Sequence, residues 1–104
     1  MKKIRHFVAF NFKEETSEAQ IEKICKAFRS LKDEIPGVES FEGGMNVSPE
    51  NLNMGFTWGF LLTFGNEQAR DEYLVHVSHQ KFVAQLLPLI QGAFVFDYND
   101  QFVV

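Results

Sequence analysis

The segments of this chain that are predicted to be β-strands are apolar on both faces. This feature restricts the possible folds more than any other in the sequence. Alternate side chains of a strand point to opposite faces. In residues 4–12 one face carries Ile4, His6, Val8, Phe10 and Phe12, and the other carries Arg5, Phe7, Ala9 and Asn11. Residues 55–64 repeat this pattern. Since an exposed apolar sheet face is unfavourable in water, we expect both faces of the sheet to be covered.

A helix is predicted between the first two extended segments. Ser17 and Gln20 form a capping box, and apolar residues follow at three- and four-residue spacing until Pro36-Gly37 ends the pattern. Residues 38–47 then form a second extended segment. Within it, Gly43-Gly44 indicates a bulge or a close approach of two backbones.

The second half of the chain predicts a strand over 55–64, two helices and a last strand over 93–98. Asn66 is expected to cap a short helix that runs to about Val75, and Ser78 to cap another, which Pro88 should bend or break. The order β-α-β-β-α-β predicts the ferredoxin-like α+β arrangement, an antiparallel four-stranded sheet with helices on one face.

One face of this sheet is left without helices to cover it. It carries Phe7, Ala9, Gly59, Leu61, Phe94, Phe96 and Tyr98. Burying a Phe fully stabilises a protein by roughly 1.5–3 kcal/mol, so several such rings favour packing against a second copy around a two-fold axis. We therefore expect a homodimer, a dimeric α+β barrel. The alternative is a monomer whose C-terminal tail folds back over the sheet.

Composition excludes several classes of protein. The 104 residues predict one domain over 1–104, and 45% hydrophobic with 23% charged residues is ordinary for a globular chain. A net charge of −4 lacks the basic footprint of a nucleic-acid binder or an anionic-membrane binder. A single cysteine, with no long apolar run or secretory leader, indicates a cytoplasmic protein. No cofactor is expected.

Histidines and a tyrosine are the candidates for chemistry. Tyr73 and His76 are three residues apart and can share a helix face, and His79 opens the next helix, where the helix dipole favours a neutral imidazole. A neutral imidazole can act as a base, and a tyrosine hydroxyl can polarise a carbonyl. The alternatives are hydrogen-bonded structural histidines, zinc on the His-x-x-His pair, or axial haem ligation. Asp97 either orients a histidine or ends the last strand in water.

The residues also resemble a known family, the stress-responsive A/B barrel proteins, almost from end to end. The resemblance rests on the order and spacing of His6-Phe7-Val8-Ala9-Phe10, Ile35-Pro36-Gly37-Val38, Gly44-Met45-Asn46-Val47-Ser48, Tyr73-Leu74-Val75-His76-Val77-Ser78-His79 and Val95-Phe96-Asp97-Tyr98. Members are small dimeric α+β barrels, which agrees with the fold inferred from the strand faces.

The resemblance also implies site residues. In a branch of plant polyketide cyclases of the olivetolic acid cyclase type, catalytic Tyr and His residues fall on Tyr73 and His79, and a supporting His on His6. The implied pocket between sheet and helices is lined by Val8, Phe10, Ile24, Cys25, Phe28, Trp58, Phe60, Leu62, His76, Phe82 and Val95. That branch carries a His at Trp58, and Trp cannot act as a base. Some plant members hold magnesium on main-chain carbonyls, which match Lys32, Ile35 and Val38.

Two functions remain open from the sequence. In the first, a homodimer binds a small apolar or aromatic carbonyl compound in this pocket, with cyclase-like acid/base chemistry by His79 and Tyr73. In the second, the dimer is a structural or stress-resilience protein without a ligand, and its twelve Phe residues fill the cores.

Overall fold

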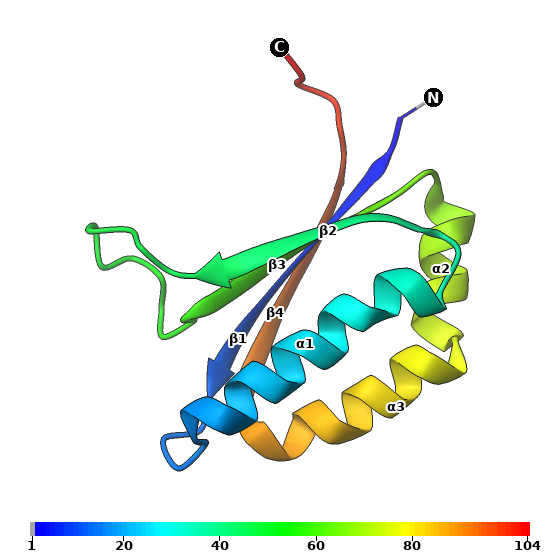
Figure 1. Cartoon of the computed structure of the whole chain (residues 1–104). Helices are drawn as coiled ribbons and strands as arrows, with labels where there is room; N and C mark the ends of the chain where they lie inside the picture. The colour runs from blue at the N-terminus through cyan, green and yellow to red at the C-terminus, as the bar shows by residue number, and fades with distance from the viewer. Residues whose placement is uncertain (1) are drawn as a thin grey trace.

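A computed structural model describes residues 2–104 of the chain (Figure 1). The elements are β1 (Ile4–Phe12), α1 (Glu18–Glu34), β2 (Val38–Met45), β3 (Trp58–Phe64), α2 (Glu67–Val75), α3 (Val77–Leu86), the 3₁₀ helix η1 (Leu87–Leu89) and β4 (Ile90–Asn99). The strands pair antiparallel in the order β2-β3-β1-β4. In Figure 1, α1 and α3 lie on the same side of this sheet. The chain therefore has the predicted ferredoxin-like α+β fold.

Side-chain caps determine where the first two helices begin. The Gln20 N–H donates to Ser17 Oγ at 3.1 Å and the Ser17 N–H donates to Gln20 Oε1 at 2.8 Å, which is the predicted capping box. The Ala69 N–H donates to Asn66 Oδ1 at 2.8 Å, so Asn66 caps α2 as expected.

The cap of α3 differs from the prediction. Helix α3 begins at Val77, and the Ser78 N–H donates to His76 Nδ1 at 3.0 Å, so His76 rather than Ser78 caps the helix. An imidazole nitrogen with a free lone pair accepts this bond as a hydroxyl oxygen would. Pro88 lies in η1 and ends the α-helical pattern, as predicted.

Strands β2 and β3 are both shorter than the sequence predicts, and the loop between them is longer. Strand β2 ends at Met45, and β3 begins at Trp58 rather than at Gly55. Gly55 has φ +83°, a conformation that suits glycine, and the Phe56 N–H donates to the Asn53 carbonyl at 2.9 Å. Gly55 and Phe56 therefore belong to a turn, although they continue the alternating apolar pattern of β3 in the sequence.

Gly43 allows the predicted close approach between β2 and β3. A Cβ atom at this position would overlap Cδ1 of Phe60 and would lie 2.7 Å from the Gly59 carbonyl oxygen. Any larger residue would have to displace the Phe60 ring and the backbone of β3.

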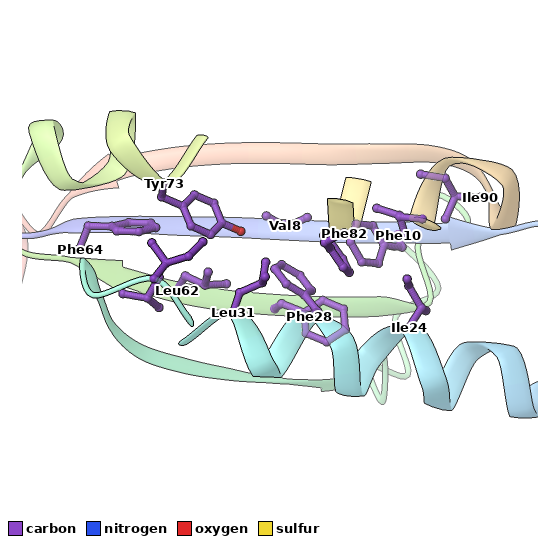
Figure 2. Close-up of a cluster of buried hydrophobic side chains, with 14 of the residues drawn as sticks. Val8, Phe10, Ile24, Phe28, Leu31, Leu62, Phe64, Tyr73, Phe82 and Ile90 are labelled. Atoms are coloured by element: carbon purple, nitrogen blue, oxygen red, sulfur yellow. The ribbon is translucent and has the colours of Figure 1, made fainter. Parts of the chain in front are cut away.

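The core lies between the sheet and the helices and is rich in aromatic rings (Figure 2). Phe28 of α1 is central to it, with ring centroids 4.6 Å from Phe82, 4.9 Å from Phe60 and 5.8 Å from Phe10. These four rings join α1, α3, β3 and β1 in one packed cluster.

The opposite face of the sheet is open. Phe94, Phe96 and Tyr98 of β4 are 44%, 56% and 45% exposed. The tail after β4 does not cover this face, since Phe102 is 98% exposed. Within residues 2–104, no helix has the length and apolar character to cross a membrane.

Candidate functional site

Three side chains from different elements meet at one end of the core. The ring centroids of Tyr73 (α2) and His79 (α3) are 4.5 Å apart, and those of Tyr73 and His6 (β1) are 5.9 Å apart. Phe64 of β3 packs against both His6 and Tyr73, at 6.0 and 5.0 Å. The structure thus brings together the three residues that the resemblance implied as catalytic, and their roles stay predictions.

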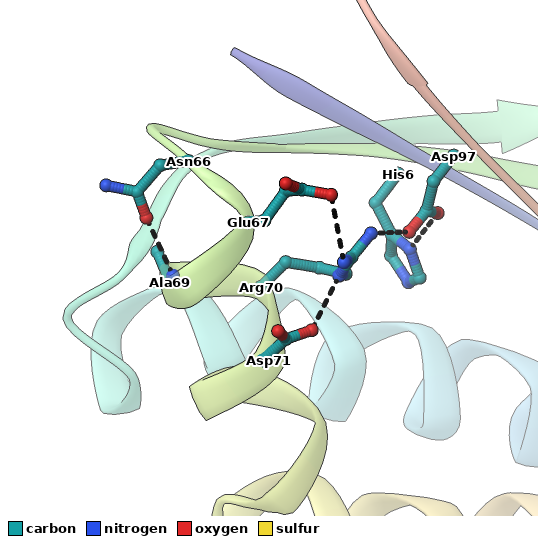
Figure 3. Close-up of polar contacts among 7 residues, drawn as sticks. All are labelled: His6, Asn66, Glu67, Ala69, Arg70, Asp71 and Asp97. Carbon is teal, nitrogen blue, oxygen red and sulfur yellow. Dashed lines mark hydrogen bonds and ion pairs between the residues drawn. The ribbon is translucent and has the colours of Figure 1, made fainter.

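His6 is oriented by Asp97, one of the two alternatives that the sequence left open for this carboxylate. The two residues are register partners on β1 and β4, and His6 Nδ1 lies 2.6 Å from Asp97 Oδ1 (Figure 3). An ionised carboxylate only accepts hydrogen bonds, so Nδ1 carries the hydrogen. In the neutral imidazole the lone pair is therefore on Nε2.

Tyr73 presents its hydroxyl to the inside of the protein. The residue is 1% exposed, and burial raises the pKa of its phenol above the ordinary value, so the group stays a donor at neutral pH. Figure 2 shows the oxygen directed toward Val8. No side-chain hydrogen bond within residues 2–104 uses this hydroxyl, and it is not fully enclosed, because every fully buried side-chain N or O there is paired. The hydroxyl is thus free to donate to a ligand.

His79 is a half-buried base. Its Nδ1 lies 3.1 Å from the Leu74 carbonyl oxygen, which can only accept, so Nδ1 carries the hydrogen and Nε2 holds the lone pair. Burial lowers the pKa of His79, the bond to Leu74 opposes this, and the nearby His6 lowers the pKa further. The neutral form, which can take up a proton, therefore persists to lower pH than in a free histidine.

This lowered pKa predicts an acid-sensitive contribution to stability. In the unfolded chain His79 takes up a proton near its ordinary pKa of about 6.5, whereas the folded chain resists protonation to lower pH. The contribution is therefore present above about pH 6.5 and is lost as the pH falls through the lower folded-state pKa. We expect the free energy of unfolding of His79→Gln, from urea titrations, to fall less than that of the wild type over this range. Equal falls would contradict the prediction.

Arg70 is a site residue that the sequence analysis did not identify. Its Nη1 donates to Asp97 Oδ2 at 2.9 Å, its Nε donates to Asp71 Oδ1 at 3.0 Å, and its Nη2 lies 3.9 Å from Glu67 Oε1 (Figure 3). Asp97, the largest cause, and Asp71 raise the pKa of the guanidinium, while burial acts in the opposite direction. The available signal was its spacing, because Arg70 and Tyr73 are three residues apart on α2 and so share a face.

Most of the residues implied to line a pocket are packed in the core. Val8, Phe10, Ile24, Phe28, Phe60, Leu62 and Phe82 are buried in one cluster, with Cys25 and Trp58 partly buried at its margin. His76 caps α3, and Val95 on β4 is 57% exposed. Whether these residues line a ligand pocket stays a prediction.

A hollow of about 600 Å³ lies between α1 and the edge of the sheet, and three of the implied pocket residues line it: Cys25, Trp58 and Phe60. Trp58 is paired with Phe10 at one end of β1, and Phe64, which contacts Tyr73, with Ile4 at the other. Trp58 and Phe64 are six residue steps apart along β3, roughly 20 Å. The hollow and the histidine cluster thus lie at opposite ends of the aromatic core. Burial raises the pKa of the Cys25 thiol to about 11, so this thiol is unreactive at neutral pH.

The residues expected at a dimer interface all lie on the open sheet face. Phe7 pairs in register with Leu61 and Phe96, and Ala9 with Gly59 and Phe94. A second hollow, of about 630 Å³, lies on this face beside the β2–β3 loop. Phe7, Ala9, Gly59 and Phe94 line it together with exposed loop residues such as Leu52.

The implied magnesium site can be compared with the backbone after α1. The Ile35 carbonyl accepts a hydrogen bond from the Val38 N–H at 3.1 Å, which leaves it one further lone pair. Within residues 2–104, no group of three or more His, Cys, Asp or Glu side chains could hold a metal ion. A site built from the Lys32, Ile35 and Val38 carbonyls stays a prediction.

Fold and site together define a ferredoxin-like α+β protein with a His–Tyr–His cluster between helices and sheet. Comparison with known families agrees with this class. The model of the Stress responsive A/B Barrel Domain matches residues 4–100. The chain therefore belongs to the stress-responsive A/B barrel family.

Three known proteins are similar to this chain. The stress-response A/B barrel domain-containing protein HS1 of Arabidopsis thaliana is 33% identical over 96 residues, which cover 92% of this chain and 88% of HS1. Olivetolic acid cyclase of Cannabis sativa is 27% identical over 96 residues, covering 92% and 95%. The crystal structure of a dimeric ferredoxin-like protein of unknown function from Jannaschia sp. CCS1 has a TM-score of 0.82 at 28% identity, covering 92% and 97%.

Proposed function

We propose that the chain forms a homodimer through its open sheet face. The support is the exposure of Phe94, Phe96 and Tyr98 on a face that the tail leaves uncovered, and the dimeric state of the similar Jannaschia protein. A second copy of the same face would cover these rings without any further partner. We also propose that residues 1–104 act as one domain in the cytoplasm, which fits the single thiol and the net charge of −4.

We further propose that this dimer binds a small apolar or aromatic carbonyl compound at the His6–Tyr73–His79 cluster. The observation that carries this proposal is the 4.5 Å approach of the Tyr73 ring, whose hydroxyl is free, to the ring of His79, whose lone pair is on Nε2. Olivetolic acid cyclase, 27% identical, is a relative whose name describes a cyclase. A carbonyl ligand would accept a hydrogen bond from Tyr73, and the surrounding aromatic rings would pack against its apolar part.

The same geometry supports acid/base chemistry on the ligand. His79 Nε2 would take the proton from the carbon next to the carbonyl, and the electron pair of that C–H bond would move toward the carbonyl oxygen. Tyr73 would donate its hydrogen bond to the negative charge that develops on this oxygen. Asp97 would keep the Nε2 lone pair of the neutral His6 available beside Tyr73.

The ligand proposal is tested by removing the Tyr73 hydroxyl alone. The hydroxyl has no protein partner, so we expect Tyr73→Phe to keep nearly the stability of the wild type and to lose the rise in melting temperature that an aromatic ketone such as acetophenone gives the wild type. Differential scanning fluorimetry over a ketone titration measures both quantities. Tyr98→Phe on the open sheet face is the matched control and should respond like the wild type. Equal stabilisation of Tyr73→Phe would contradict the proposal.

A second function is supported by the packed aromatic core. Phe28 stacks on Phe82 and contacts Phe60 where the resemblance places a pocket, which suits a structural dimer without a ligand. On this alternative, ketones leave the melting temperature of the wild type unchanged, while His79→Ala still lowers it through the lost packing against Tyr73.

A further inference from the structure

Asp97 divides its two carboxylate oxygens between two elements. Oδ1 lies 2.6 Å from His6 Nδ1 on β1, and Oδ2 accepts from Arg70 Nη1 on α2 at 2.9 Å. The Asp97 and Arg70 side chains are 24% and 19% exposed, and that of His6 is 5% exposed. The three groups therefore form a partly enclosed chain of hydrogen bonds from α2 to the buried imidazole.

The guanidinium restricts what Asp97 can do. Its hydrogen bond from Nη1 to Oδ2 holds the carboxylate in one orientation. An ionised carboxylate in this orientation accepts from Nδ1–H, so the neutral His6 has its lone pair on Nε2. The positive charge of Arg70 also offsets the negative charge of Asp97, which would otherwise act on His6 alone.

Arg70 also connects the two halves of the cluster. It lies one helical turn before Tyr73, on the same face of α2. The ion pair with Asp97 therefore links the helix that carries the tyrosine to β4, whose register partner β1 carries His6. Asp71 and Glu67, on the same helix as Arg70, hold the remaining nitrogens of the guanidinium.

From this geometry we propose that Arg70 is a positioning residue of the cluster, which acts through Asp97 to fix the tautomer of the neutral His6, with the hydrogen on Nδ1 and the lone pair on Nε2, beside Tyr73. The proposal rests on the proposed ligand site for its functional meaning. The groups that face His6 are Asp97 from β4, Tyr73 from α2, Phe64 from β3 and, through its charge, His79 from α3. Of these groups, only Asp97 is bound by Arg70, and it accepts the hydrogen bond from His6 Nδ1.

The test measures the protonation of His6 directly in the ligand-free protein. Nitrogen NMR spectra of the histidine rings distinguish a nitrogen that bears a lone pair from one that bears a hydrogen. At a slightly alkaline pH, we expect the wild-type His6 Nε2 to give the lone-pair signal. In Arg70→Met the carboxylate loses the bond that orients it and can turn toward solvent, which releases the Nδ1–H of His6. The tautomer with its hydrogen on Nε2 then becomes populated, and the Nε2 signal shifts toward that of a nitrogen that bears a hydrogen.

Two further variants separate positioning from a structural effect. Arg70→Lys keeps the positive charge and should restore most of the wild-type His6 signal. Arg29→Met on α1 removes an equal charge from an exposed position and should leave the signal unchanged. Backbone amide spectra establish that each variant is folded. A wild-type His6 signal in folded Arg70→Met would overturn the proposal, as would an equal shift in Arg29→Met.

The ligand experiment is independent of this readout. If acetophenone fails to stabilise the wild type, the proposed ligand site fails, while the His6 signal still decides whether Arg70 sets the state of the imidazole. If the ketone binds and the His6 signal does not respond to Arg70→Met, the ligand site stands and the role of Arg70 is refuted.

Discussion

Replacing Phe96 with aspartate is expected to convert the proposed dimer into a folded monomer. Phe96 is 56% exposed on the open face of the edge strand β4, where it stacks on Phe94 at 6.3 Å and pairs in register with Phe7. Burying one Phe stabilises by roughly 1.5–3 kcal/mol, and a two-fold dimer buries two copies. Their loss, with two carboxylates placed in an apolar interface, should raise the dimer dissociation constant by roughly a hundredfold or more.

Sedimentation velocity at micromolar concentration measures this change. The wild type should sediment at about twice the chain mass of 12.0 kDa, and Phe96→Asp at the chain mass. Phe102→Asp makes the same substitution in the exposed tail and should leave the dimer intact. A wild type that sediments as a single chain would refute the dimer, and a dimeric Phe96→Asp would show that the contact lies elsewhere.

Replacing Phe28 with alanine is expected to cause the largest loss of stability. Phe28 is 1% exposed and its ring contacts Phe10, Phe41, Phe60 and Phe82 from four other elements. Removing a buried ring costs the transfer free energy of its atoms and leaves a cavity among neighbours that cannot fully collapse. The free energy of unfolding should fall by about 3–5 kcal/mol.

Chemical denaturation at a fixed protein concentration measures this loss, since the stability of a dimer depends on concentration. Phe102→Ala is the matched control, and a change within about 0.5 kcal/mol is expected at so exposed a position. A loss below about 1 kcal/mol in Phe28→Ala would mean that the ring is not central to the core. The cavity also lies within the implied pocket, so the variant tests whether added space there increases ketone binding.

The sequence predicted the elements wherever a local interaction determines them. The capping box of Ser17 and Gln20 and the Asn66 cap involve residues three apart, and both helices begin where those residues predict. The alternation of residues 4–12 fixes which side chains share a face, because the side-chain period of a strand is two. The surplus of apolar faces, and the family to which the chain belongs, were therefore readable without a structure.

Predictions failed where a short sequence pattern is compatible with more than one local structure. Gly55 continues the alternation of β3, but a positive φ places it in a turn. Ser78 is a common cap residue, yet His76 two positions earlier supplies the acceptor because α3 begins two residues sooner than predicted.

The tertiary structure alone decided how the candidate site is assembled. His6 meets Asp97 because the two residues are register partners on β1 and β4. The alternation of apolar residues along each strand does not specify this register, which also shifts between Asn11 and Phe12. Arg70 reaches Asp97 only once α2 packs near β4. The ligand-sized hollow lies at the far end of the core from Tyr73, because the rings around Phe28 fill the space between them. Residue types and periodicity set which groups point inward, whereas distances between groups on different elements follow from strand register and ring packing, and these involve contacts far apart in the chain.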